Sequence, residues 1–272
     1  MTATAVSITH ETDRAPVRVP GLVDVLRSEW IKLASVRSTW WTLGATVILG
    51  AGLTVILCAA NAAWLAGGTA DESPGSFITW GMMIAQICAV VLGALCVTSE
   101  YSTGMIQATF AAVPSRGTVM LAKSVLITTL MFVVGTATAL LGYVGGNYFL
   151  SREGIGLPLA GDVLRSMYGS GLFLACIALL SVGVGFIARH TAGTITLVLA
   201  VILILGNMVM MVPGTVGDWL GKLMPGNAGQ AISSPVPFNP ELLSAWPGLA
   251  VLVAEVAVVL AIAWVLVRRR DA

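Results

Sequence analysis

Charge is what this 272-residue sequence has least of. Aspartate, glutamate, lysine and arginine make up 10% of the chain, against about 25% in soluble domains, while 57% of the residues are hydrophobic. The mean hydropathy is +0.92. Such a composition excludes an ordinary soluble domain, and the net charge of +1 points to neither a nucleic-acid partner nor a strongly acidic one. We therefore expect an integral membrane protein in contact with lipids.

Cysteine and histidine are also scarce. The four cysteines lie inside apolar runs with no CxxC or Cys/His cluster, which argues against disulfides and zinc. His10 falls in the N-terminal tail and His190 at a turn, and neither belongs to an HExxH motif or lies near paired aspartates. The sequence therefore predicts no catalytic residue, no metal site and no cofactor, and we expect the cysteines to be buried as small apolar side chains.

Long apolar runs dominate what remains. Crossing the hydrocarbon core of a bilayer takes roughly 20 residues, and six runs reach that length: about 40–65, 77–97, 125–150, 167–188, 191–212 and 246–267. The predicted fold is an all-α integral membrane protein with a six-span transmembrane domain over residues 40–270. The first run starts too late and is too long for a removable signal peptide.

Two segments precede the first run. Residues 1–20 are polar, contain two prolines and are expected to be a disordered cytoplasmic tail. In residues 21–39, apolar side chains recur every three to four positions, at Leu22, Leu26, Trp30 and Leu33. This pattern predicts an amphipathic helix in the headgroup layer of the membrane. A solvated helix that only supplies positive charge beside the membrane is the alternative.

The basic residues set the expected orientation. With the N-terminus in the cytoplasm, eleven of the fourteen lysines and arginines fall on the cytoplasmic side, and only Arg152, Arg165 and Lys222 fall outside. Because short cytoplasmic loops carry an excess of Lys and Arg, both termini are expected in the cytoplasm. The eleven are Arg14, Arg18, Arg27, Lys32, Arg37, Arg116, Lys123, Arg189, Arg268, Arg269 and Arg270.

The polar stretch SEYSTGMIQATFAAVPSRGTVMLAKS, residues 99–124, interrupts the apolar runs and would also face the cytoplasm. Gly104 is a hinge candidate, and Pro114 should end a short helix. That helix carries an apolar stripe of Met105, Ile106, Thr109, Phe110 and Val113. A separate cytoplasmic partner could grip such a helix. Alternatively, the stripe packs on the protein's own spans or lies in the headgroups.

The charged residues of this stretch have expected partners. Glu100 would pair with Arg116 or Lys123, or with a partner protein; we favour an intramolecular brace for Glu100 and a partner contact for Arg116. The run GTVMLAKS, residues 117–124, is similar to a phosphate-binding loop. However, Ala122 replaces the required glycine and an apolar span follows directly, so we expect no nucleotide to bind there.

Residues 213–245 form the largest segment expected outside the cell. They are rich in glycine and proline but include an apolar helix face of Trp219, Leu220, Leu223 and Met224. We expect an extracellular loop with re-entrant helices, which are tolerated at membrane depth when buried in protein. A plain surface loop is the alternative.

Several features together resemble the membrane-spanning permease subunit of a bacterial ABC-type exporter of the small six-span kind. They are the six spans, the N-terminal LRSEWIKLASVRSTWW, the 99–124 stretch and a late LMPGNAG. The most specific element is the series E-Y-x-x-G…P-x-R-G…A-K, formed by Glu100, Tyr101, Gly104, Pro114, Arg116, Gly117, Ala122 and Lys123. The resemblance extends from Gly21 to Arg270.

This resemblance implies a function. The chain would form the transmembrane pathway of an ATP-driven exporter in the bacterial cell membrane, and would not be an enzyme itself. A separate cytoplasmic ABC ATPase subunit would bind the ATP and contact the 99–124 coupling loop. The usual twelve-span assembly implies a second permease copy or a similar permease chain. The implied ATPase-coupling residues are Glu100, Gly104, Met105, Phe110, Pro114 and Arg116.

Two other functions stay open. An ion-coupled secondary transporter would place several ionisable residues near the midplane, whereas this chain offers only Glu255 and no obvious inverted repeat. A non-transport membrane protein, such as an intramembrane enzyme, would need a catalytic constellation that the sequence lacks. The sequence does not identify a transported substrate.

Glu255 lies near the middle of the last apolar run. A charge at that depth costs about 2.5–3.5 kcal/mol on insertion scales, and its neighbours on the same helix face are all apolar. We therefore expect the neutral acid, hydrogen-bonded to another helix, with Asn147 and Asn207 as candidate partners. A place in the substrate pathway is the alternative.

Overall fold

The computed structural model describes residues 21–68, 72–113, 115–236 and 241–269. Within these ranges all regular structure is helical, and six helical segments are long and apolar enough to cross a membrane. The predicted all-α, multi-pass membrane protein is confirmed at this level. The six segments are α2 (Arg37–Ala66), α3 with α4 (Pro74–Phe77 and Met82–Ser102), α6 (Arg116–Arg152), α7 (Gly161–Ala188), α8 with the π-helical turn η1 and α9 (Thr191–Leu199, Ala200–Leu205 and Gly206–Val209), and α12 (Ala245–Arg269).

The largest difference from the expected span boundaries is at α6. This helix starts at Arg116, whereas the apolar run pointed to about residue 125. Lys123 lowers the local hydropathy, but lysine is a good helix former and does not interrupt the helix. Val119 and Met120, near the start of α6, are buried. The last part of the 99–124 stretch, from Arg116 onward, therefore belongs to a spanning helix.

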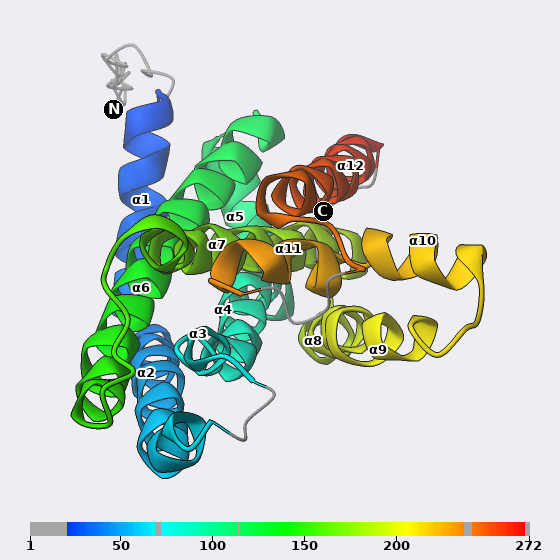
Figure 1. Ribbon diagram of the computed structural model, residues 1–272. Coiled ribbons are helices and arrows are strands. Elements are labelled where there is room, and N and C mark those ends of the chain that lie inside the picture. Colours follow the sequence, from blue (N-terminus) through cyan, green and yellow to red (C-terminus); the bar gives the residue numbers. More distant parts are fainter. Residues whose placement is uncertain (1–20, 69–71, 114, 237–240, 270–272) are drawn as a thin grey trace, which may run out of the picture.

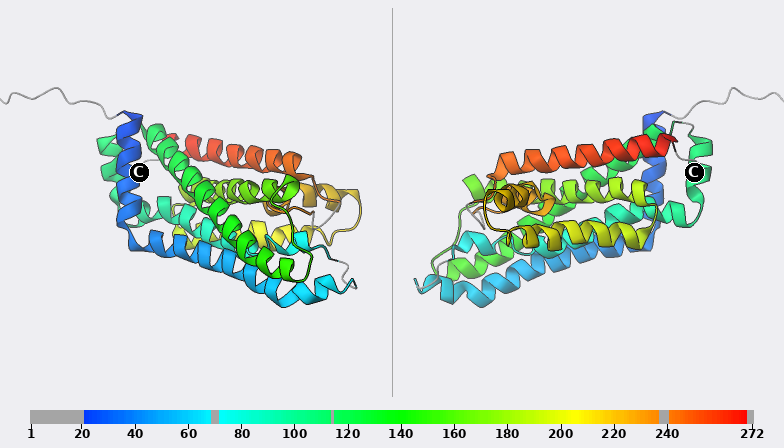
Figure 2. Two further views of the ribbon diagram at one scale, coloured as in Figure 1. Left: turned by 60° about the vertical axis from the view of Figure 1, so that its left-hand side comes forward. Right: turned by 90° about the vertical axis from the view of Figure 1, so that its right-hand side faces the viewer.

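Four further helices lie at the two ends of the bundle (Figures 1 and 2). At one end, α1 (Leu22–Ser35) and α5 (Met105–Ala112) run across the direction of the spans. At the other end lie α10 (Thr215–Leu223) and α11 (Pro225–Ser233). We call these the α1/α5 end and the α10/α11 end. The end of α12 lies at the α1/α5 end (Figure 2).

Helices α4 and α7 form the centre of the bundle. Helix α7 contacts α4, α6 and α12, and α4 also packs on α2. The two central helices approach so closely that a Cβ atom at Gly93 would lie 2.2 Å from the carbonyl oxygen of Ala178. The outer helices expose large apolar side chains, among them Trp41, Ile48 and Val258. Such a surface suits lipid better than water.

Helix α1 has a face that the sequence pattern did not reveal. Leu22 and Trp30 are exposed, as a membrane-contacting face requires, but Leu33 of the same predicted stripe is buried in the protein. Val25 and Glu29 are buried with it, at intervals of four residues, where α1 packs against α6. A two-sided amphipathic pattern therefore missed a third, protein-facing side. The expected disordered tail, residues 1–20, lies outside the described residues.

The segment expected to contain re-entrant helices separates into two unlike helices. Helix α11 packs against α7 and α12, and its first five residues, 225–229, are all buried. Helix α10 instead exposes its apolar face, including Trp219, Leu220 and Leu223. The buried helix is thus held within protein, whereas the exposed one offers apolar surface at the edge of the bundle.

Arg165 of α7 anchors the C-terminal end of α11. Its Nη1 donates to the carbonyl oxygens of Ala231 at 3.1 Å and Ile232 at 3.4 Å, and its Nη2 donates to that of Ser234 at 3.1 Å. The last carbonyl groups of a helix have no partner within the helix. Arg165 supplies these partners and so fixes α11 against the bundle.

Candidate functional site

Two lysines and two glutamates meet at the α1/α5 end, and we call these four residues the charge cluster; three of them are buried, and Lys32 is partly exposed. Glu29 and Lys32 come from α1, Glu100 from the end of α4 and Lys123 from the start of α6. Only 1% of Lys123, 3% of Glu29 and 2% of Glu100 is exposed. The two positive and two negative formal charges cancel.

Lys123 occupies the centre of the charge cluster. Its Nζ donates to Glu29 Oε2 at 2.5 Å, to Glu100 Oε1 at 2.7 Å and to the carbonyl oxygen of Cys96 at 3.1 Å. Lys32 Nζ donates to Glu29 Oε1 at 2.6 Å and to Glu100 Oε1 at 3.0 Å. Burying an ion costs several kcal/mol unless a close opposite charge and hydrogen bonds compensate for the lost water. Both ammonium groups here have that compensation.

The charge cluster extends to α5 through Thr109. Lys32 Nζ donates to Thr109 Oγ1 at 3.1 Å, so one ammonium group contacts α1, α4 and α5 together. Ile106 of α5 is buried as well. Displacing α5 would therefore either break buried polar contacts or move the ends of the spanning helices with it.

The apolar stripe predicted for α5 faces mainly the protein itself. Ile106 and Thr109 are buried, and Phe110 and Val113 pack on Val25 of α1 and on α6. The sequence reading left this packing open as an alternative to a partner contact, and the structure favours it for these side chains. The opposite face of α5 is exposed and consists of Met105, Gln107, Ala108, Ala111 and Ala112.

The residues named for ATPase coupling have different surroundings. Glu100 pairs with Lys123 as an intramolecular brace. Gly104 precedes α5 with φ +71°, a conformation that glycine adopts without strain, and Met105 is 42% exposed. Arg116 Nη1 donates to the carbonyl oxygen of Val267 at 2.8 Å, and its guanidinium lies over the Phe110 ring. Pro114 lies outside the described residues.

Sequence reasoning missed Glu29 as a member of the site and counted Lys32 only among the basic residues of the cytoplasmic side. A signal was available in the spacing. Val25, Glu29 and Leu33 repeat at intervals of four, and Lys32 is three residues after Glu29, which places an ion pair on an otherwise apolar helix face. A charged pair within such a stripe indicates a buried polar contact to another helix.

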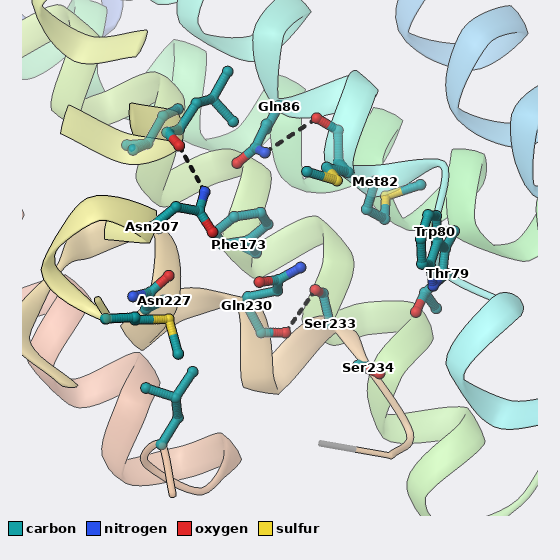
Figure 3. A pocket seen from close by; sticks show the side chains of 16 residues that line it. Thr79, Trp80, Met82, Gln86, Phe173, Asn207, Asn227, Gln230, Ser233 and Ser234 are labelled. Atoms are coloured by element: carbon teal, nitrogen blue, oxygen red, sulfur yellow. Dashed lines mark hydrogen bonds between the residues drawn. The ribbon is translucent and has the colours of Figure 1, made fainter. Parts of the chain in front are cut away.

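A second candidate site is a cavity of about 320 Å³ nearer the α10/α11 end (Figure 3). Helices α4, α7 and α11 line it together with η1 and α9. Four amide side chains reach it, those of Gln86, Asn207, Asn227 and Gln230. Of the sixteen described residues that form its wall, none carries a charge. This cavity could hold an uncharged molecule.

The predicted pairing of Glu255 with Asn147 or Asn207 is wrong. Asn147 Oδ1 accepts from the backbone N–H of Leu157 at 2.7 Å, and Asn207 Nδ2 donates to the carbonyl oxygen of Leu203 at 2.6 Å. Glu255 instead borders an apolar groove between α7, α8 and α12. Its Oε2 has no hydrogen-bond partner within the part of the chain that the structure describes.

Two comparisons with known proteins found no relative of this chain. The sequence matches no protein-family model, and no curated protein matches it significantly. Among the described residues, no group of three or more His, Cys, Asp or Glu side chains could hold a metal ion. Functional inference therefore rests on the charge cluster, the cavity and the sequence features.

Proposed function

We propose that this chain is the permease subunit of an ATP-driven ABC-type exporter, and that a separate cytoplasmic ATPase subunit acts on it through α5. The observation that carries the proposal is the link between α5 and the spans. Lys32 contacts Thr109 of α5 and Glu100 of α4 with the same ammonium group, and Glu100 is bonded in turn to Lys123 of α6. A push on α5 is thereby transmitted to two spanning helices.

The exposed face of α5 is suited to a protein partner. It carries no charge, and Ala108, Ala111 and Ala112 are small enough for another backbone to approach closely. Met105 adds a flexible apolar side chain at one end of this face. An ATPase subunit would grip this side of α5, while the buried side keeps the helix attached to the bundle.

Charge distribution supports a cytoplasmic α1/α5 end. Arg27, Arg37 and Arg268 are at or near this end, where an excess of basic residues favours the cytoplasm. Val23, Trp30 and Ile31 of α1 are exposed and form an apolar surface for the headgroup layer. We place the protein in the bacterial cell membrane with both termini inside. A second permease copy or a similar chain would complete the pathway.

The experiment is co-purification of this chain with a co-expressed candidate ABC ATPase subunit. Ala108→Asp places a charge on the exposed face of α5, so it should leave the chain inserted and folded. Recovery of the ATPase should fall at least tenfold, and ATP-dependent export should be lost. Ser35→Asp is the matched control, because Ser35 is exposed on α1 at the same end. Normal ATPase recovery and export with Ala108→Asp would contradict the proposal.

Phe110→Asp is a different experiment. Phe110 packs on α1 and α6 and lies beneath the Arg116 guanidinium, so a carboxylate there should destabilise the α1/α5 end directly. Loss of the ATPase in that variant would report unfolding rather than a lost contact. Its thermal unfolding midpoint should fall below that of Ala108→Asp, and equal midpoints would show that the two faces of α5 were assigned incorrectly.

Orientation is tested with variants that each add one cysteine to the parent chain at an exposed position. With membrane-impermeant thiol reagents, Arg152→Cys and Asp218→Cys should react from outside intact cells. Ser115→Cys and His190→Cys should react only after the membrane is opened. The parent chain is the control, because its four cysteines are buried or half-buried. Outside labelling of Ser115→Cys would invert the orientation.

A further inference from the structure

The cavity near the α10/α11 end has a wall that plays no part in the proposed contact with an ATPase. Its volume of about 320 Å³ is at the small end of the range for small-molecule pockets, roughly 300–1,000 Å³. The π-helical turn η1 contributes Ile202 and Leu203 to the wall, and π-helical turns occur frequently at functional sites.

Two amides present carbonyl oxygens to this cavity. Gln86 Nε2 donates to the carbonyl oxygen of Met83 at 3.0 Å, and Asn207 Nδ2 donates to that of Leu203. Each amide thus uses one N–H group on its own spanning segment, and its oxygen accepts no hydrogen bond within the described residues. Figure 3 shows both oxygens directed toward the space between α4, α9 and Phe173. This part of the wall accepts hydrogen bonds.

Gln230 of α11 supplies a third amide. Its side chain makes no hydrogen bond within the described residues and extends toward the cavity (Figure 3). Its oxygen and both of its N–H groups are available to a ligand, whereas each of the other two amides already uses one N–H group. The position of α11 is fixed by Arg165 at one end and by Asn227, whose Nδ2 donates to the carbonyl oxygens of Gly206 and Gly221, both at 3.1 Å. The site is therefore preformed.

The remaining wall is uncharged: Met82, Phe173 and Ile202 contribute apolar surface, and Thr79, Ser233 and Ser234 contribute hydroxyl groups. A charged ligand would lose its water there without meeting an opposite charge, which costs several kcal/mol. An uncharged ligand with hydroxyl or amide N–H groups would instead satisfy the two carbonyl oxygens and Gln230. Its apolar part would contact Phe173 and the methionines.

We propose that this cavity binds an uncharged amphiphile that carries hydroxyl or amide N–H donors. Identifying that molecule as the exported substrate rests on the proposed function, whereas binding itself does not. The site lies away from α5, so occupancy can be measured on the permease chain alone, without ATP or an ATPase.

The test uses three photoreactive probes that share one diazirine-bearing octyl chain: an octyl glucoside, an octanoate and an octylammonium. With the purified chain in lipid nanodiscs, the glucoside should label α4 and α11 saturably, and each charged probe should label them at least tenfold less. Gln230→Leu and Asn207→Leu should each weaken glucoside labelling at least tenfold. Asn61→Leu is the matched control, because Asn61 also donates to its own helix but lies on α2, outside the cavity.

Gln230→Lys gives the sharpest outcome, because it should make octanoate the preferred probe by adding a cation to the wall. Thermal unfolding identifies any variant that fails to fold, and the remaining variants still decide the question. Equal labelling by all three probes, unsaturable labelling, or an equal loss with Asn61→Leu would overturn the proposal. Saturable binding without ATP-dependent export would leave the site standing and contradict the export function. ATP-dependent export without saturable binding would support the export function and contradict the binding site.

Discussion

At the α1/α5 end, two lysines and two glutamates pair with one another in a largely buried cluster, whereas all polar side chains that line the cavity nearer the α10/α11 end are uncharged. In the charge cluster the charged side chains bond to one another. Lys123 by itself makes three such contacts, to Glu29, Glu100 and the Cys96 carbonyl oxygen. In the cavity, Gln86 and Asn207 each use one N–H group within their own helix and keep an oxygen available.

This difference separates two tasks. Buried ion pairs are costly to leave unpartnered, so they hold helices in one register and suit an end that transmits movement. Neutral amides are cheaper to leave half-bonded, so they suit a wall that is empty at one time and occupied at another. We therefore expect the charge cluster to be the more rigid of the two, as the proposed coupling requires, and the cavity wall to be the more adaptable, as the proposed ligand binding requires.

Lys123→Met should produce the largest effect, because it leaves Glu29 and Glu100 buried with only Lys32 between them. Breaking a buried ion pair by removing one partner costs about 3–5 kcal/mol. We expect a strongly lowered thermal unfolding midpoint in detergent and a reduced yield of folded protein. A midpoint close to that of the unaltered chain would show that the charge cluster does not hold the α1/α5 end together.

Two related variants sharpen this result. Lys32→Met should cost less than Lys123→Met, because 29% of the Lys32 side chain is exposed and water replaces part of the lost contact. Adding Glu29→Gln to Lys123→Met should recover part of the stability, since it removes one of the unpaired charges. If the double variant were less stable than Lys123→Met, hydrogen-bond geometry rather than charge balance would dominate the cluster.

Gln86→Glu places a carboxylate, the kind of group found in the charge cluster, in the wall of the cavity. A carboxylate at this position loses the N–H bond to the Met83 carbonyl oxygen and places a charge in a wall without a cation. We expect a loss of roughly 2 kcal/mol in the free energy of unfolding. Gln107→Glu on the exposed face of α5 is the matched control and should change stability by less than about 0.5 kcal/mol. Equal effects at the two positions would remove the distinction between a buried wall and an exposed face.

The helices could be predicted from the sequence, because twenty or more apolar residues in succession leave few alternatives. The beginning of α6 could not be located, since Arg116 and Lys123 lower the hydropathy without ending the helix. The sequence also did not predict that residues 213–245 form an exposed α10 and a buried α11, because both helices mix glycine with apolar residues. Which of them is buried depends on Arg165, far away in the sequence.

The candidate sites were only partly predictable. The sequence left three options for Glu100, namely Arg116, Lys123 or a partner protein; in the structure Glu100 pairs with Lys123, and Arg116 reaches α12 instead. Glu29 looked like one more polar residue on a surface helix. The cavity was not foreseen, because Gln86 lies more than 120 residues before the other three amides, Asn207, Asn227 and Gln230. Periodicity reports which face of a helix is apolar but not what covers it.

Glu255 lies between the two ends and follows neither pattern, so it carries the smallest predicted effect. It has neither the lysines of the charge cluster nor a hydrogen bond like those of the cavity amides, and its Oε2 is buried without a partner among the described residues. An unsatisfied buried polar group costs about 1–3 kcal/mol, and an apolar replacement of similar shape removes that cost. Glu255→Leu should therefore raise the free energy of unfolding by about 1 kcal/mol.

Glu255→Gln provides the comparison, because it removes the acid while keeping a polar group. It should not match the gain of Glu255→Leu, since the amide would meet the same apolar residues of α7, α8 and α12. Both variants are measured by thermal unfolding and by size-exclusion chromatography of the detergent-solubilised chain. If Glu255→Leu lowered the unfolding midpoint and Glu255→Gln left it unchanged, the polar group at position 255 would have a partner outside this chain. A second copy lying along the groove would be the natural source, and a smaller apparent size of the Leu variant would then accompany the loss of stability.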